Sequence, residues 1–154
     1  MPAATRTFLL IVDGSAEMPV ALRYAATRAL VSNARLMLLA IIPPQPVTEW
    51  GLVQEALNTE HHLRAQETLT KAAELAYSIT GRLACLEIAG GEPTKLILKV
   101  LQANPNIANL FLAANTKSAD PGPLVSYFSR QGLKELRVPL VLIPDGLPDE
   151  LFAL

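Results

Sequence analysis

The chain has 154 residues, of which 51% are hydrophobic and 5% aromatic, and its formal net charge is −1 at pH 7. Acidic and basic residues are interspersed, and the lack of a basic stripe argues against nucleic-acid binding. A chain of this length suits one domain with a single core of helices on a sheet. We therefore expect one domain over residues 1–154, with its core at about 7–144 and a C-terminal tail at 145–154.

The apolar runs are too short to cross a membrane. The first run stops at Asp13, too early for a signal peptide. The longest, LMLLAII, falls far short of the roughly 20 residues of a membrane helix. We expect no membrane association and a cytoplasmic location. The only cysteine, Cys85, cannot form an internal disulfide, and its apolar surroundings predict a small buried core residue.

The first half of the chain alternates short apolar runs with longer amphipathic stretches. The run TFLLIV at 7–12 predicts a strand, and in the helix that follows Pro19 fits only the first turn. The run RLMLLAII at 35–42 predicts a second strand, and the proline-rich IIPPQPVTEWG after it predicts a loop. A long helix comes next and ends at Gly81. The inner faces expected for the two helices are Leu22, Ala25, Ala26, Ala29 and Leu30, then Leu69, Ala72, Ala73, Ala76 and Tyr77.

The second half continues this alternation. The run RLACLEI at 82–88 predicts a third strand, NLFLAA at 109–114 a fourth and VPLVLIP at 138–144 a fifth. Pro93 suits the first turn of a third helix, and a fourth helix is expected between Pro123 and Leu136. The inner faces expected for these helices are Leu96, Ile97, Val100 and Leu101, then Val125, Phe128 and Leu136.

This order of elements predicts an α/β domain built on an open, doubly wound, five-stranded parallel sheet. Right-handed crossovers place helices on both faces of such a sheet. The strand segments are continuously apolar rather than alternating, as expected of strands covered on both faces.

Several stretches in order resemble the universal stress protein family. They are FLLIVDGSAEMPVALRYAATRALVSNARLMLLAIIPP, GGEPTKLILKV and RVPLVLIP, and together they cover roughly Thr7 to Pro144. The resemblance implies a flavodoxin-like, Rossmann-like sheet of strand order 3-2-1-4-5, often in a dimer. It also implies one of two kinds of member: one binds ATP, and the other has lost that site and acts as a stress-linked protein.

The resemblance places a ligand crevice where strand order reverses, at the carboxyl ends of the first and fourth strands. Asp13, Gly14 and Ser15 follow the first strand. In nucleotide-binding members the matching acid lies near the adenosine and the metal. The backbone that matches Ile41, at the end of the second strand, touches the base. This half of the site is present.

The phosphate half departs from the family pattern. Binding members resemble G-x-x-G, about nine residues, then G-S/T, so that bare amides and a helix N-terminus surround the phosphates. Here the glycine positions correspond to Ala114, Lys117 and Ser126, and Tyr127 places a bulky ring where a small hydroxyl belongs. Two further amide donors are lost because Pro121 and Pro123 lack them, and Gly122 alone cannot restore the loop. Groups that could still contact a phosphate are Asn115, Thr116, Lys117, Ser118 and Ser126.

We therefore expect a stress-response interaction protein with an unknown protein partner, no cofactor and no enzymatic activity. Asp13 and its neighbours would then form a structural turn or help to cap the next helix. A second hypothesis is a nucleotide-binding module that takes ATP or AMP with Mg²⁺ in a half-pocket between Asp13 and Ile41. A third is a very slow ATP hydrolase that uses Asp13 and a metal.

No other stretch assembles catalytic or metal chemistry. Adjacent His61 and His62 point about 100° apart on a helix and cannot chelate one ion, so we expect them to face solvent. The sequence lacks a G-x-S-x-G elbow, a Walker-type phosphate loop and a Cys-x-x-Cys pair.

The last strand predicts a homodimer. Prolines at its two ends, Pro139 and Pro144, are typical of an edge strand. Its apolar residues would be an aggregation hazard unless a second copy covers them, as the resemblance also implies. The expected interface consists of Pro139, Leu140, Val141, Leu142 and Ile143. The tail either adds Leu151, Phe152 and Leu154 to this contact or frays.

Overall fold

The structure is a computed structural model that describes residues 5–44 and 51–152, with the backbone alone at residues 51–57. Its five strands form one parallel sheet of order β3-β2-β1-β4-β5, as predicted. Most of the proline-rich stretch predicted as a loop lies outside the described residues. The elements are β1 (Thr7–Val12), α1 (Met18–Ser32), β2 (Arg35–Ile42), α2 (Gly51–Thr80), β3 (Cys85–Gly90), α3 (Pro93–Ala103), β4 (Ile107–Ala114), α4 (Pro123–Phe128) and β5 (Leu140–Pro144), with short 3-10 helices η1 (Leu133–Glu135) and η2 (Asp149–Phe152).

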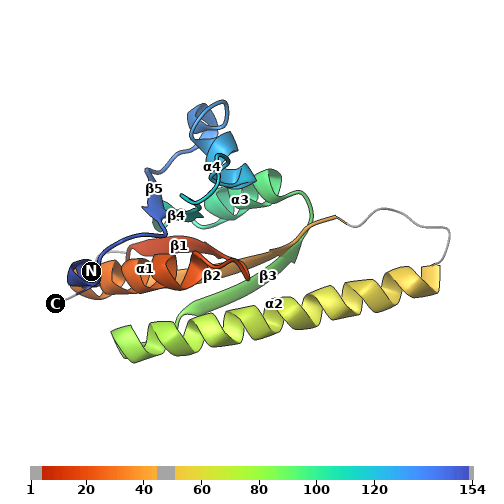
Figure 1. Cartoon of the computed structure of the whole chain (residues 1–154), viewed down its shortest axis with the longest axis horizontal. Coiled ribbons are helices and arrows are strands. Elements are labelled where there is room, and N and C mark those ends of the chain that lie inside the picture. Colours follow the sequence, from red (N-terminus) through yellow and green to blue (C-terminus); the bar gives the residue numbers. More distant parts are fainter. Residues whose placement is uncertain (1–4, 45–50, 153–154) are drawn as a thin grey trace.

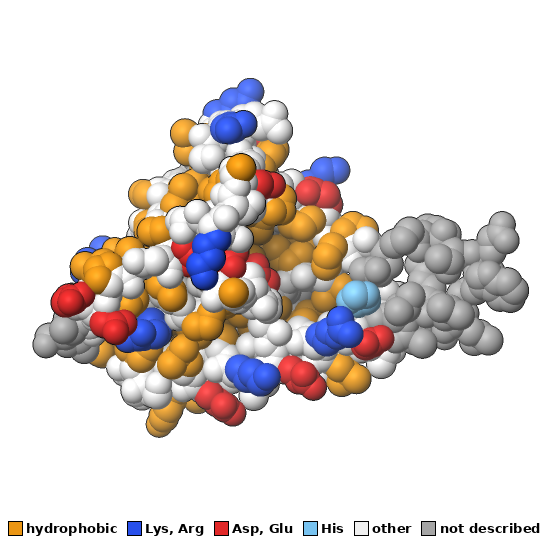
Figure 2. Space-filling view, viewed as in Figure 1, with side chains coloured by type: hydrophobic (Ala, Val, Ile, Leu, Met, Phe, Trp, Pro, Cys, Tyr) orange, Lys and Arg blue, Asp and Glu red, His pale blue; other side chains and the backbone are white. Residues whose placement is uncertain are grey.

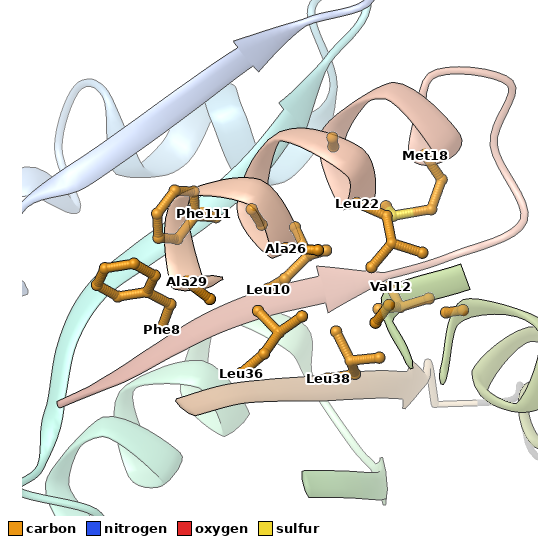
Figure 3. Close-up of a cluster of buried hydrophobic side chains, with 14 of the residues drawn as sticks. Phe8, Leu10, Val12, Met18, Leu22, Ala26, Ala29, Leu36, Leu38 and Phe111 are labelled. Carbon is orange, nitrogen blue, oxygen red and sulfur yellow. The ribbon is translucent and has the colours of Figure 1, made fainter. Parts of the chain in front are cut away.

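Helices cover both faces of the sheet, with α1 and α2 on one side and α3 and α4 on the other (Figure 1). Side chains alternate along β1, so that Leu10 packs under α1 while Leu9 packs under α3 and α4. Figure 3 shows the first cluster, in which β1, α1, β2 and β4 meet. The rings of Phe8 and Phe111 lie 5.1 Å apart there. Small alanines such as Ala26 let α1 approach the sheet closely.

The ends of the helices follow local residue chemistry. Proline lies in the first turn of α1 and of α3, as predicted. Asn33 ends α1 in the left-handed region with φ 54°, and Gly81 follows α2 with φ 69°. The Glu92 side chain caps α3, because its carboxylate accepts from the amides of Thr94 at 3.2 Å and Lys95 at 3.0 Å.

The prediction that all strands are covered is wrong for β3. Cys85 is exposed rather than buried, and Leu86 is 46% exposed. Tyr77, predicted on the inner face of α2, is 53% exposed. The cause is the place of β3 at the sheet edge, because the described helices pack mainly over the central strands.

The fourth helix is shorter than predicted. It ends at Phe128, and only η1 follows before β5. The amide of Gly132 bonds to the carbonyl of Tyr127 at 2.9 Å, which closes the helix end and turns the chain. A Cβ at position 132 would lie 2.2 Å from the Tyr127 ring, so the turn requires glycine. Val125 and Phe128 are buried as expected.

The tail packs on its own chain. The guanidinium of Arg23 in α1 lies 4.2 Å from the centre of the Phe152 ring and 3.7 Å from the Asp149 carboxylate. Phe152 therefore packs on its own chain rather than fraying, and its contact with a second copy stays a prediction. Leu151 is 50% exposed, and Leu154 lies outside the described residues.

Across the described residues, no helix combines the length and apolar character needed to span a bilayer.

Candidate functional site

The turn after β1 is held by the side chain of Asp13. Its Oδ1 accepts from the amide of Ser15 at 2.9 Å, which is the side-chain turn predicted for this residue. Asp13 does not cap α1, because the residue at the cap position is Glu17 and it makes no side-chain cap bond. The Ser15 hydroxyl is shielded from solvent and has no hydrogen-bond partner among the described residues. The first half of the predicted site is thus a structured turn.

The loop after β4 uses its own side chains to satisfy its amides. The amide of Lys117 donates to Asn115 Oδ1 at 2.8 Å, and the amide of Asp120 donates to the Ser118 hydroxyl at 3.2 Å. Across the loop, the amide of Asn115 donates to the carbonyl of Pro121 at 3.1 Å. These amides lie where a nucleotide-binding loop would offer donors to phosphate, but each already has an acceptor.

The carboxylate of Asp120 lies at the start of α4 and accepts hydrogen bonds there. Its Oδ1 accepts from the amide of Gly122 at 2.9 Å and from the hydroxyl of Ser126 at 3.2 Å. A carboxylate of the chain therefore occupies the position where the resemblance places a phosphate contact. Sequence reasoning missed this residue. The signal was an Asp two positions before a Gly, because Asp commonly accepts from the amide two residues later in a turn.

Tyr127 does not block the site as the sequence suggested. Its ring packs against Phe128 at 5.1 Å in an edge-to-face arrangement, and its hydroxyl donates to Glu135 at 2.7 Å. The hydrogen bond to the Glu135 carboxylate raises the pKa of the Tyr127 phenol. Tyr127 therefore ties α4 to η1.

Three adjoining hollows surround Asp13, which lines each of them. One of about 290 Å³ runs between Ser15 and Lys71, and one of about 230 Å³ lies beside Ile41 and His61. The third, of about 150 Å³, lies against Gly122. The largest of the three is close to the roughly 300 Å³ at which ligand pockets begin. Figure 2 shows hydrophobic side chains on the floor of the recess between α2 and the layer of α3 and α4.

Charged side chains of both signs lie around these hollows, and Lys71 and Arg64 line two of them. Asp13 and Glu17 line the smallest one, and Asp120 lies in the adjoining loop. The hydroxyl of Thr116 donates to Asp145, and this bond lowers the pKa of the Asp145 carboxyl. Within the described part of the chain, no three His, Cys, Asp or Glu side chains gather closely enough to hold a metal ion.

The family assignment comes from comparison with known proteins. The model of the universal stress protein family matches residues 4–110, which is more than half of the chain. The chain belongs to the universal stress protein family. The match ends within β4, so the loop that follows β4 lies beyond it. The curated proteins gave no match.

Solved structures of universal stress proteins share the fold of this family member. UspA from Lactobacillus plantarum superposes with a TM-score of 0.76 at 20% identity, covering 92% of this chain and 99% of its own. A universal stress protein in complex with cAMP gives 0.65 at 16% identity, covering 94% and 100%. The protein from Archaeoglobus fulgidus in complex with dAMP gives 0.62 at 16% identity, covering 91% and 98%.

In this universal stress protein, the predicted site residues fall into two groups. Asp13, Gly14 and Ile41 line one hollow together, beside His61 and Arg64 of α2. Sequence reasoning placed His61 in solvent, whereas it is partly buried at this hollow, and Arg64 pairs with Glu60 at 2.8 Å. The other group, Asn115, Lys117 and Ser126, belongs to the self-bonded loop and its helix.

The predicted interface residues lie on an edge strand, since β5 pairs with β4 alone among the described strands. Leu142 is 40% exposed, while Ile143 is 1% exposed because its side chain packs into the core under α1. Ile143 could join an interface only through its backbone.

Proposed function

We propose that this universal stress protein is a non-enzymatic interaction protein of the stress response that does not bind ATP in the usual mode of the family. It works in the cytoplasm as a homodimer with a protein partner. The observation that supports the loss of ATP binding is the self-bonded loop, in which Asn115, Ser118 and Asp120 accept from the amides of Lys117, Asp120 and Gly122.

The energetic reason is competition for donors. A triphosphate would have to displace these internal acceptors and lie near the carboxylate of Asp120. Each of these amides would exchange an internal acceptor for a phosphate oxygen, so the net gain from the exchange is small. Like charges held close together reduce this gain further. The usual gain from preorganised loop amides is therefore absent.

A second candidate function is binding of a nucleoside monophosphate. The hollow beside Asp13 and Ile41 favours it, because a base can use that hollow without the phosphate loop. Two structural relatives are described in complex with cAMP and dAMP. A monophosphate also needs fewer amide donors than ATP.

Calorimetric titration separates the candidates. Mg²⁺ with ATP should give no binding heat, while AMP binding that Asp13→Ala abolishes would support the second candidate. Glu150→Ala, at an exposed tail residue, is the matched control for removal of one carboxylate. Micromolar ATP binding that is lost in Asp13→Ala would overturn the proposal. Phosphate release above the blank in the same samples would instead favour the slow hydrolase.

A further inference from the structure

The most spacious hollow described lies at the other end of the sheet from Asp13. Its volume is about 600 Å³, twice that of the largest hollow at Asp13, and falls in the range of small-molecule pockets. It opens at the amino ends of β2 and β3, beside the last turns of α1 and α2, at the end of the sheet where Figure 1 marks the chain termini.

Small side chains leave this space open. The floor combines alanines from both helices and from the strand ends with the larger Leu30 and Leu36, and no acidic residue lines it. The alanines are Ala29, Ala34, Ala76 and Ala84. The lining combines this apolar floor with the polar side chains of Thr5, Asn33 and Thr80, and burial of an apolar group on the floor contributes about 25 cal/mol per Å².

Two arginines line the opening of the hollow without a partner. The guanidinium groups of Arg35 and Arg82 make no ion pair or side-chain hydrogen bond within the described residues, and both residues are exposed. In this they resemble Arg28 and Arg130 and differ from Arg64, which pairs with Glu60, and from Arg137, which bonds to main-chain carbonyls. Each free guanidinium presents donors in the fork that matches a carboxylate.

The lining also includes an apolar side chain that the fold leaves uncovered. Leu83 is 90% exposed, although it lies between α2 and β3 where the chain could have carried a polar residue. Val31 and Tyr77, on the neighbouring last turns of α1 and α2, are 59% and 53% exposed. These exposed side chains do little for the stability of the isolated chain.

We infer that this hollow binds a small amphipathic carboxylate. The carboxylate accepts from Arg35 and Arg82, and the apolar body lies on the alanine floor between the ends of α1 and α2, under Leu83. The charge of the opening selects an anion, and the apolar floor selects a molecule with a hydrocarbon portion. This site is independent of the turn at Asp13, so its test leaves the nucleotide question separate.

The test uses octanoate as the probe, with octanamide as its uncharged analogue and acetate as the anion without an apolar body. Amide NMR shifts of the full chain should move at Thr80 and Ala84, and calorimetry should give the affinity. Octanamide and acetate should each bind at least about tenfold more weakly, as expected when one charge-assisted contact or the apolar contact is lost.

Variants locate the site. Arg82→Gln and Arg35→Gln should each weaken octanoate binding by about tenfold, the size of one charge-assisted hydrogen bond. Arg28→Gln is the matched control, because Arg28 is an exposed arginine of α1 that does not line the hollow. No binding of octanoate at about ten millimolar, equal losses in Arg28→Gln and Arg82→Gln, or shifts confined to other parts of the sheet would each overturn the inference.

Discussion

At the scale of single residues, the loop after β4 uses a carboxylate of its own chain as an acceptor for its amides. Asp120 accepts from Gly122 and Ser126, and Asn115 and Ser118 accept from two further amides. In a phosphate-binding loop the ligand provides these acceptors. Here the loop is complete without a ligand.

This arrangement predicts the effect of Asp120→Ala. The amide of Gly122 loses its acceptor, so its hydrogen exchange should speed up, while the amide of Ser126 keeps its bond to the Gly122 carbonyl at 2.9 Å and should change little. Amide exchange followed by NMR measures both, with Glu150→Ala as the control. Unchanged protection at Gly122 would show that Asp120 does not hold the loop.

Glu92 gives a prediction on pH. The hydrogen bond from the Thr94 hydroxyl and that from the Lys95 amide lower the pKa of Glu92 from its usual value of 4.5. A carboxyl whose pKa is lowered by folding stabilises the fold above its unfolded pKa, and this contribution is lost as the pH falls through the folded value. The melting temperature should therefore fall less for Glu92→Gln than for the wild type when the pH is lowered from 7 to below about 4.

Asp145→Asn is a second variant of the same kind, because the hydrogen bond from the Thr116 hydroxyl also lowers the pKa of Asp145. Each single variant should remove part of the acid sensitivity, and the double variant should remove more. Thermal melts at several pH values measure the effect. A Glu92→Gln melt that follows the wild type at every pH contradicts the assignment.

The two aspartates also show what sequence reasoning can reach. The turn at Asp13 was predictable because its acceptor and donor are two residues apart in Asp-Gly-Ser. Asp120 makes an equally local bond to Gly122, yet its significance depends on the loop closing from Asn115 to Pro121 and on Ser126 one turn into α4. These two contacts depend on how the loop folds back on itself, which the local sequence does not show.

At the scale of elements, apolar runs and helix-terminal residues were enough to place the strands and most helix ends. These features did not predict how much of each helix or strand is covered by the elements packed against it. The exposure of Cys85 depends on where β3 lies in the sheet, and the early end of α4 depends on Tyr127 packing over Gly132. Both are contacts between residues whose proximity is decided by packing and chain turns rather than by periodicity.

Arg137 joins the end of α3 to the approach of β5. Its guanidinium donates to the carbonyls of Leu101 at 2.6 Å, Asn104 at 2.7 Å and Ile107 at 3.1 Å. These contacts satisfy helix-end carbonyls and place a cation at the negative end of α3. The C-terminal end of α3 is thus held by Arg137, a residue more than thirty positions away from Leu101.

Arg137→Ala should lower the free energy of unfolding by about 2–4 kcal/mol, because charged hydrogen bonds are lost and carbonyls are left without donors. Arg137→Lys should recover only part of this, since an ammonium cannot reach three carbonyls as a planar fork does. Urea unfolding followed by circular dichroism measures the change. The control is Arg130→Ala, at an exposed arginine that makes no side-chain bond in the described structure. Equal losses in the two alanine variants would contradict the role of Arg137.

At the scale of the whole molecule, the two ends of the sheet differ in charge. Asp13, Asp120 and Asp145 gather at the carboxyl ends of the strands, while Arg35 and Arg82 lie at the amino ends. Charged side chains of both signs run along α2, as Figure 2 shows at the lower edge of the molecule. The three aspartates at one end thus have hydrogen-bond partners within the chain, whereas the two arginines at the other end lie unpaired beside an open hollow.

The two edges of the sheet differ as well. β3 carries the exposed Glu87, and a charge on an edge strand opposes pairing with another chain. β5 has no charged residue between Leu140 and Pro144. We therefore propose that dimerisation uses β5, with two copies pairing antiparallel around a two-fold axis and continuing the sheet across it. Because Leu142 is the middle residue of β5, a pairing centred on the strand places it opposite its own copy.

Leu142→Asp should convert such a dimer to a monomer. The change puts one carboxylate from each copy face to face at the axis, where opposed like charges destabilise pairing. Light scattering on the full chain should give twice the chain mass of 16.6 kDa for the wild type and the single mass for Leu142→Asp. Leu133→Asp is the matched control, since Leu133 is 52% exposed but lies in η1, away from the strand edge. A monomeric wild type, or loss of the dimer in Leu133→Asp as well, would contradict dimerisation through β5.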